Sequence, residues 1–284
     1  MSDHEPPSAG PSLWELLVED WRAERPVAMA EVVAGPEDLV GGKLVVRPGA
    51  GNDPAEIVGS LGDADLDRVV SRDAAGELAA GLSGTRHYGR HGEAMNREVE
   101  VFIESFAPPP RMIIFGAVDF TAALGRVGKI LGYHVTVCDA RPVFATVARF
   151  PMADEVIVDW PDRYLAKVGD SLGVRDVVCV LTHDPKFDVP AVVAALETNV
   201  GYLGAMGSRR THDERLARLR EAGVEDAGLT RLMSPIGLDI GARTPEETAV
   251  AICAEIIARR TGRAAPSLKD REGPIHAVPA QPAG

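Results

Sequence analysis

The chain has little cysteine and no long apolar run, and each shortage excludes a class of protein. Its 284 residues include three cysteines, Cys138, Cys179 and Cys253, which are odd in number and far apart. The sequence therefore predicts neither a disulfide framework nor a zinc site. No run approaches the roughly 18 apolar residues of a membrane-spanning helix, and the polar start lacks the apolar core of a signal peptide. We therefore expect a cytoplasmic protein that does not enter a membrane.

Basic residues are also in the minority. The chain has 30 Lys and Arg against 42 Asp and Glu, which gives a formal net charge of −12. Nucleic-acid binders and polybasic membrane-surface proteins carry charge of the opposite sign, so we expect neither kind of partner. The hydrophobic share of 45% and the charged share of 25% are those of an ordinary globular protein. The length favours about two domains.

Three consecutive prolines mark the boundary between those domains. The segment 105–110 (Ser-Phe-Ala-Pro-Pro-Pro) predicts an extended linker, because proline interrupts helices and central strands. Before it, residues 1–104 predict a smaller α+β domain, in which Trp14, Leu17, Val18 and Trp21 recur at the spacing of an amphipathic helix. Further elements are expected there as strands over 27–33, 43–46, 56–61 and 98–104 and as a helix over 63–80.

After the linker, short β-branched runs alternate with helical segments. The runs cover 112–115, 134–139, 155–158, 176–181 and 200–205. This alternation is typical of a parallel sheet covered on both faces, so residues 111–262 predict a Rossmann-like, doubly wound α/β domain. Thr244, followed by Pro245 and Glu247, predicts the start of its last helix. The tail 263–284 is rich in Pro and Ala and is predicted to be disordered.

The first loop of this sheet is a poor dinucleotide site. Ligands of such sheets bind outside the carboxyl ends of the strands, and Gly116 follows the first strand. A dinucleotide fingerprint needs glycine at 118 and glycine or alanine at 121, where this chain has Val118 and Thr121. Asp119 adds negative charge at a helix N-terminus, which repels an anion, although it could simply cap the helix. Ordinary NAD(P) binding is therefore disfavoured.

Polar residues follow two further strands. Asp139 stands where a ribose-binding carboxylate would fall, with a structural role in the turn as the alternative, and Arg141 could meet a phosphate or pair with Asp139. Thr182, His183 and Asp184 follow a later strand and could bind a ligand, and the stretch that ends at Asp188 could ligate a metal or move protons. Its spacing matches no strong metal motif, and a capped turn with a solvated histidine is the alternative.

A glycine-rich turn predicts an anion site. The stretch 201–210 ends in Met-Gly-Ser-Arg-Arg and leads into a helical segment. Such a turn exposes backbone N–H groups, and the arginines add positive charge in an acidic chain. We therefore expect phosphate binding here, against the alternative of a tight turn with solvated arginines. The residues assigned to this turn are Gly204, Gly207, Ser208, Arg209 and Arg210. The loop 234–242 has either a structural role or a ligand contact at the same edge.

In combination, these stretches resemble the XdhC/CoxI family, the accessory factors of xanthine dehydrogenase and carbon monoxide dehydrogenase. The matching stretches are 135–142, 181–184, 202–210, 235–242, 244–250 and 254–257, with weaker matches at 41–45 and 59–61. The resemblance implies binding of the molybdenum cofactor, a pterin phosphate, and help with its sulfuration and insertion into a molybdenum hydroxylase. It also implies a homodimer, and a sulfur-donating desulfurase as a further partner.

The chain departs from the family pattern at two places. Asp65 stands where members commonly carry a cysteine, and a carboxylate cannot carry sulfur. Val118 and Asp119 replace the glycine and histidine that are common in the first loop. These departures leave open a paralogue with an altered ligand or one that only binds a partner protein, and an NAD(P)-dependent oxidoreductase is the remaining alternative. We predict no catalytic or metal-ligating residue. The predicted cofactor-binding residues are Gly116, Asp139, Arg141, Thr182, His183, Asp184, Gly204, Gly207, Ser208, Arg209 and Arg210.

Overall fold

The first half of the chain folds around an antiparallel sheet. The computed structural model describes residues 12–49, 55–93, 96–182 and 184–270. The sheet has the strand order β3-β2-β1-β5-β4, and every neighbouring pair is antiparallel. Its elements, with the two helices that pack on it, are α1 (Leu13–Arg22), β1 (Val27–Ala34), β2 (Lys43–Arg47), β3 (Glu56–Ser60), α2 (Ala64–Ala80), β4 (Gly84–Tyr88) and β5 (Val99–Phe106).

The two helices of this half cover opposite faces of the sheet. Asp63 caps α2 by accepting hydrogen bonds from the N–H groups of Asp65 and Leu66, and the helix then buries Leu66, Val70 and Leu78 against one face. On the other face, α1 buries Leu17 against Val27 and Val45. Each helix thus closes a core of its own on the sheet.

Only part of the apolar face that predicts α1 packs on the sheet. The helix lies where expected, but Trp14 is 65% exposed and Trp21 is 60% exposed. The packed face is formed by Leu13, Leu16 and Leu17 instead. The sequence therefore predicted the helix correctly, but of the four residues that carried the prediction only Leu17 is buried in the core.

The predicted linker is two residues too long at its start. Ser105 and Phe106 continue β5, because they pair with Ala28 and Val27 of β1. The strand pairing ends before Pro108, since prolines have no N–H to donate. The segment between the two sheets is therefore 107–110. Strand β4, which was not predicted from the sequence, pairs along the other side of β5.

The second half is the expected Rossmann-like unit. All its strand pairs are parallel, in the order β11-β10-β9-β6-β7-β8, so the order reverses at β6. This confirms the predicted doubly wound α/β class. The elements are β6 (Arg111–Phe115), α3 (Asp119–Ile130), β7 (His134–Cys138), β8 (Glu155–Ile157), α4 (Pro161–Val168), β9 (Val177–Val180), α5 (Pro185–Leu196), β10 (Tyr202–Ala205), α6 (Arg209–Glu221), α7 (Asp226–Leu229), β11 (Leu232–Met233) and α8 (Pro245–Arg260), with short 3₁₀ turns at Gly169–Ser171 and Leu268–Asp270.

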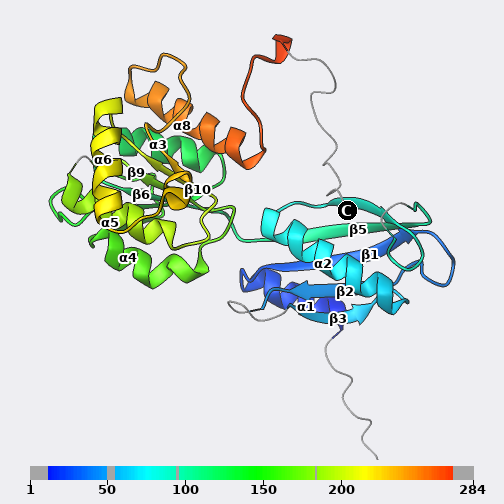
Figure 1. The fold of residues 1–284 in the computed structure, drawn as a ribbon. Helices are drawn as coiled ribbons and strands as arrows, with labels where there is room; N and C mark the ends of the chain where they lie inside the picture. The colour runs from blue at the N-terminus through cyan, green and yellow to red at the C-terminus, as the bar shows by residue number, and fades with distance from the viewer. Residues whose placement is uncertain (1–11, 50–54, 94–95, 183, 271–284) are drawn as a thin grey trace, which may run out of the picture.

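Helices cover both faces of the parallel sheet (Figure 1). On one face, α3 and α8 pack over side chains such as Ile114 and Cys179, and on the other, α4, α5 and α6 pack over Phe115 and Val178. Strand side chains are buried on both faces, which explains the nearly continuous apolar runs in the sequence. Helix α8 begins as predicted, with Thr244 and Glu247 in a reciprocal capping box.

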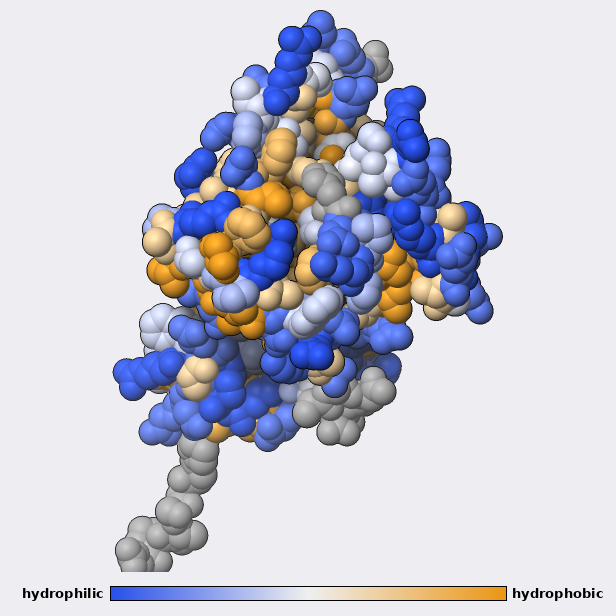
Figure 2. Space-filling model, turned by 90° about the vertical axis from the view of Figure 1, so that its left-hand side faces the viewer, coloured by the Kyte–Doolittle hydropathy of each residue, from blue (hydrophilic) through white to orange (hydrophobic). Residues whose placement is uncertain are grey.

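One side of the second half is largely hydrophilic, and the tail is only partly described. Figure 2 shows that hydrophilic side chains cover much of the side where α5 and α6 lie, as expected from the charged content. Within the tail predicted to be disordered, residues 263–267 belong to no helix or strand, and 271–284 lie outside the described residues. Throughout the part of the chain that the structure describes, the helices are too short or too polar to cross a bilayer.

Candidate functional site

The loops at the carboxyl edge of the parallel sheet meet at the point where the strand order reverses. There, the loop after β6 touches the loop after β9. A Cβ atom on Gly116 would lie 2.9 Å from the backbone nitrogen of Thr182, and Gly116 has a φ of +107°. Only glycine fits this approach without strain. The structure thus brings these two predicted residues together, and it gives Gly116 a packing role.

The first loop uses its own backbone donors. The N–H of Gly116 donates to the Cys138 carbonyl at 2.9 Å, and that of Ala117 donates to Asp139 Oδ2 at 2.8 Å. The Val118 N–H lies 3.4 Å from the Thr121 hydroxyl, which itself donates to the Gly116 carbonyl. The loop donors from Gly116 to Val118 are therefore already occupied, and within the described residues only the N–H groups of Asp119 and Phe120, at the start of α3, stay without a partner here. This closed loop supports the expectation that the chain does not bind dinucleotides in the ordinary way.

Asp119 does not cap the helix that follows this loop. The N-cap residue of α3 is Val118, and Asp119 is the first helical residue, with an exposed side chain. The alternative that Asp119 caps the helix is therefore wrong. Its carboxylate instead faces solvent at the N-terminal end of α3, where it opposes the approach of an anion.

Asp139 and Arg141 form an ion pair at the end of β7. Arg141 Nε and Nη2 donate to the two Asp139 oxygens at 2.9 and 2.8 Å, and the Arg141 N–H adds a bond of 2.9 Å. Burial raises the pKa of Asp139, but the hydrogen bonds from Arg141 and Ala117 outweigh it and lower that pKa overall. Of the two roles left open for Arg141, the structure shows the pairing with Asp139. A ribose would have to compete with four protein donors.

Aromatic rings surround the Arg141 guanidinium. Its central carbon lies 4.5 Å from the centroid of Phe144 and 5.9 Å from that of Phe187. Phe187 packs in turn on Trp160, with 4.8 Å between ring centroids. These contacts hold the arginine over apolar surface and fix its orientation.

Thr182 and Asp184 shape the start of α5. Asp184 is the N-cap residue: its carboxylate accepts a hydrogen bond from the Lys186 N–H at 3.2 Å and pairs with the Lys186 ammonium. The buried Thr182 hydroxyl accepts a bond from the Asp184 N–H at 3.3 Å. His183 lies outside the described residues. Within the described residues, no group of three or more His, Cys, Asp or Glu could hold a metal ion.

The glycine-rich turn separates into a buried part and an exposed part. Gly204 lies inside β10, where a Cβ atom would meet the Ile236 side chain at 2.5 Å, so it serves packing and is removed from the exposed turn. Ser208 caps α6 by accepting a bond from the Thr211 N–H. Arg209 and Arg210 are exposed, and Arg210 Nε donates to Glu214 at 3.0 Å.

The backbone of this turn keeps donors available for an anion. No hydrogen bond within the described residues uses the N–H groups of Gly207, Ser208, Arg209 or Arg210. They stand at the N-terminal end of the thirteen-residue helix α6, where the helix dipole also favours negative charge. This turn differs in that respect from the closed first loop.

A buried arginine that was not predicted from the sequence holds this turn in place. Arg215 is 1% exposed, and its Nε and Nη2 donate to Asp188 at 2.9 and 2.7 Å. Nη2 also donates to the Met206 carbonyl at 2.6 Å, and Nη1 donates to the Ser234 hydroxyl at 2.8 Å. Arg215 therefore ties α5, α6 and the loops after β10 and β11 together. Its position four residues before the buried Leu219 was the available signal, because both lie on one helix face.

The loop 234–242 is anchored from the opposite side. Glu255 of α8 accepts hydrogen bonds from the Tyr202 hydroxyl at 2.6 Å and from the Gly237 N–H at 2.9 Å. Tyr202 and Glu255 are both buried. The structure thus assigns this loop a packing role at the same edge of the sheet.

None of the three cysteines reaches the surface. Cys138, Cys179 and Cys253 are buried in the cores of the parallel-sheet half. Burial raises the pKa of the Cys138 and Cys253 thiols to about 12, and it raises the pKa of the Cys179 thiol well above its usual value. Asp65, by contrast, is exposed in the first turn of α2 and lies 3.4 Å from Arg68. No thiol of this chain is therefore placed to bind a metal or carry sulfur.

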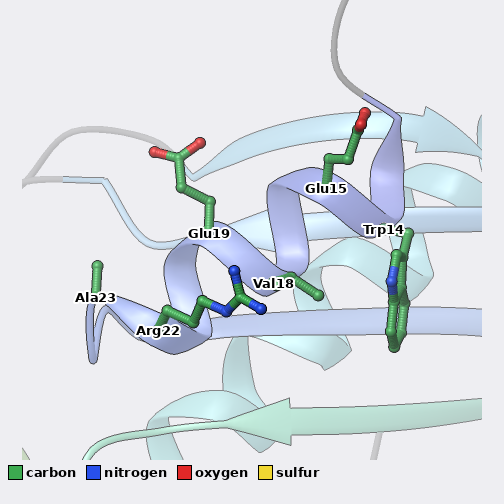
Figure 3. A pocket seen from close by; sticks show the side chains of 6 residues that line it. All are labelled: Trp14, Glu15, Val18, Glu19, Arg22 and Ala23. Atoms are coloured by element: carbon green, nitrogen blue, oxygen red, sulfur yellow. The ribbon is translucent and has the colours of Figure 1, made fainter.

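Two hollows lie along α1, away from the carboxyl edge. One has a volume of about 530 Å³ and is lined by Trp14, Glu15, Val18, Glu19, Arg22 and Ala23 (Figure 3). A second, of about 510 Å³, is lined by Trp21, Arg22, Glu24, Arg25 and residues 105–109. Neither contains a predicted cofactor-binding residue.

Comparison with known proteins gives matches over both halves. The family model described as the XdhC Rossmann domain matches residues 112–256, and that of the XdhC and CoxI family matches residues 20–89. Together these matches cover most of the described chain.

Curated relatives carry related names. A Bacillus subtilis (strain 168) protein, named as a probable subunit of xanthine dehydrogenase, is 31% identical over 170 residues, 60% of this chain and 49% of that protein. The molybdenum cofactor insertion chaperone PaoD of Escherichia coli (strain K12) is 33% identical over 159 residues, 56% of this chain and 43% of that protein. The matched region thus spans less than half the length of either relative. A solved structure titled a xanthine dehydrogenase from Bacillus halodurans is 22% identical, covers 89% of this chain and 97% of that one, and has a TM-score of 0.49.

Proposed function

Because this chain belongs to the XdhC and CoxI family, we propose that it is an accessory factor that binds the molybdenum cofactor and assists its maturation or insertion into a molybdenum hydroxylase of the xanthine or carbon monoxide dehydrogenase type. The relative PaoD is named a molybdenum cofactor insertion chaperone, which supports the same role.

The observation that carries the proposal is the contrast between the two loops of the sheet edge. The molybdenum cofactor is a pterin phosphate and needs one anion site, whereas a dinucleotide needs a first loop with available donors. The first loop uses the N–H groups of Gly116, Ala117 and Val118 in its own hydrogen bonds. Within the described residues, the turn at 207–210 keeps its N–H groups and the Arg209 side chain available, while Arg210 pairs with Glu214. The phosphate end of the cofactor therefore fits this chain.

No thiol of this chain is placed to bind the metal end of the cofactor. All three cysteines are buried, and Asp65 occupies the position at which the family resemblance implies a cysteine. A carboxylate can face a metal but cannot carry sulfur. The proposal therefore assigns sulfur delivery to a separate protein, a desulfurase, while this chain holds the cofactor.

The same proposal includes the partners and the place of action. The client is a molybdenum hydroxylase, the chain acts as a homodimer, and the location is the cytoplasm. The names of the curated relatives support the client. The homodimer and the location follow from the family resemblance and the sequence.

Molybdenum content tests the proposal. The full chain, purified from a molybdenum-replete host, should carry molybdenum and pterin, and Arg209→Ala with Arg210→Ala should lower both roughly tenfold or more by removing charge-assisted bonds. Arg218→Ala with Arg220→Ala is the matched control, because it removes the same charge from exposed positions at the other end of α6. Unchanged pterin content in the Arg209 and Arg210 variant would contradict the proposed anion site. An unaltered chain that carries neither molybdenum nor pterin would contradict the proposed function.

A further inference from the structure

Helix α1 presents an apolar face that nothing in the described chain covers. Trp14 and Trp21, two of the three tryptophans, are 65% and 60% exposed, and Val18 lies between them on the same side. Figure 3 shows Trp14, Val18 and Arg22 extending from one side of the helix. We call Trp14, Val18, Trp21 and Arg22 the outer face of α1. Exposed tryptophans concentrated on one helix are typical of a protein interface.

The residues of the outer face do not contribute to the packing of α1 on its own sheet. The packed side of α1 is formed by Leu13, Leu16 and Leu17, which close the small core against β1 and β2. The helix is also fixed at its start by the reciprocal capping of Ser12 and Glu15. Its conformation therefore does not require the two tryptophans, and nothing in the described part of the chain explains them.

The outer face continues into the segment that joins the two sheets. The second hollow is lined by Trp21 and Arg25 on the helix side and by Phe106, Pro108 and Pro109 on the other. The two hollows share Arg22, so together they form one strip of surface from Trp14 to Pro109 that carries both apolar and charged side chains.

The charges beside the strip would match those of a second copy of the helix in the opposite direction. Glu15 lies near the start of the helix and Arg22 at its end, and within the described residues neither forms an ion pair. Consider a second α1 packed antiparallel, with the two-fold axis passing between the two Val18 residues. Arg22 of one helix then lies level with Trp14 of the other helix. Arg22 is therefore one residue away from Glu15 of that other helix, and the two charged side chains lie on the same flank of the pair. Each helix thereby supplies an acid and a base to the other, as flanking charges do in antiparallel helix pairs.

From this self-complementarity we propose that the outer face of α1 is the dimer interface, with α1 of a second copy packed against it in the antiparallel sense. Trp14 and Trp21 supply the buried aromatic contacts, and the Glu15–Arg22 pairs set the direction. This inference rests on the homodimer of the proposed function and is independent of its cofactor.

Sedimentation equilibrium of the full chain tests the interface. We expect a concentration-dependent dimer, and Trp14→Ala with Trp21→Ala should raise its dissociation constant about 30-fold or more, since both residues act as interface anchors. Ile130→Ala is the control, because Ile130 is 83% exposed on α3, away from α1. Circular dichroism and urea unfolding show whether the variants keep the fold.

Charge reversal tests the antiparallel direction. Arg22→Glu alone should weaken the dimer about tenfold by placing two acids together, and Glu15→Arg added to it should restore the dissociation constant to within about threefold. Glu15→Gln keeps the capping of Ser12 and removes only the charge, so it separates the helix effect from the contact across the dimer.

Two outcomes would overturn the inference. One is a monomeric unaltered chain at about 200 µM, well above the dissociation constants of specific dimers. The other is a dimer that the tryptophan substitutions leave unchanged. Molybdenum content is measured on the same samples. If the tryptophan variants keep their molybdenum while the dimer fails as predicted, the two proposals are separately supported, and a dimer without molybdenum contradicts only the cofactor role.

Discussion

At the scale of single residues, the ion pair at the end of β7 links the stability of the folded chain to pH. Asp139 is 5% exposed and accepts hydrogen bonds from Ala117 and Arg141. The sequence presented Asp139 as either a ligand residue or a turn residue. The structure shows both oxygens occupied by protein donors, which could not be foreseen from the order of residues because Arg141 had two possible partners.

The lowered pKa of Asp139 predicts a loss of stability in acid. A carboxylate whose pKa is lower in the folded chain stabilises it above the unfolded pKa of about 4, and this contribution disappears as pH falls through the folded pKa. Asp139→Asn should therefore lower the free energy of unfolding by about 2 kcal/mol at pH 7 and by clearly less near pH 3. Urea unfolding at the two pH values measures both differences.

Asp119→Asn is the matched control for this prediction. Asp119 is the first residue of the neighbouring helix α3, is exposed, and forms no ion pair within the described residues. Its substitution should change stability little at either pH. If Asp139→Asn costs the same at both pH values, the carboxylate charge contributes nothing and only the shape of the side chain is required.

At the scale of elements, the buried pair of Arg215 and Asp188 joins two helices and two loops. Arg215→Met should destabilise the chain by about 3–5 kcal/mol, because it leaves the buried Asp188 carboxylate without its cation. Asp188→Ala should cost a similar amount, and the double variant should cost much less than the two losses together. Chemical unfolding of the four proteins measures this coupling.

An exposed ion pair between α6 and α7 provides the comparison. Arg220 pairs with Asp226 at 3.0 Å, and the two side chains are 54% and 81% exposed. Arg220→Met should therefore change the free energy of unfolding by less than about 1 kcal/mol. Additive losses for Arg215 and Asp188 would mean that the network does not act as one unit.

The elements were more predictable than the faces they bury. Strands of the parallel sheet are buried on both sides, so their apolar runs in the sequence are continuous and easily recognised. Helix α8 carries its capping residues in the sequence itself. By contrast, the spacing of Trp14 and Trp21 shows only that α1 is a helix, because periodicity does not say which apolar side meets the sheet.

The site was predictable to the level of the loops but not of the residues within them. Parallel strands bring their carboxyl ends together, so the loops after β6, β7, β9 and β10 had to meet. Gly204 was assigned to the exposed turn, but β10 extends through it to Ala205. Arg215 was missed because a charged residue on a buried helix face becomes evident only when its partner, Asp188 of another helix, is in place.

At the scale of the whole molecule, the positions of the cysteines argue against sulfur chemistry on this chain. The thiolate is the reactive form of cysteine, and all three thiols here are buried with raised pKa values. They serve the cores of the parallel-sheet half as small apolar side chains. Under the proposed function, this chain would therefore hold the cofactor while another protein supplies the sulfur.

Thiol titration tests this division of labour on the intact chain. A disulfide reagent such as 5,5′-dithiobis(2-nitrobenzoate) should label far less than one thiol per native chain at pH 8, because opening of the core must come first. It should label all three thiols after unfolding in guanidinium chloride. Rapid labelling of a native thiol, or a persulfide recovered on Cys138, Cys179 or Cys253 from the native protein, would show that the chain itself can carry sulfur. The assignment of that step to a desulfurase would then be wrong.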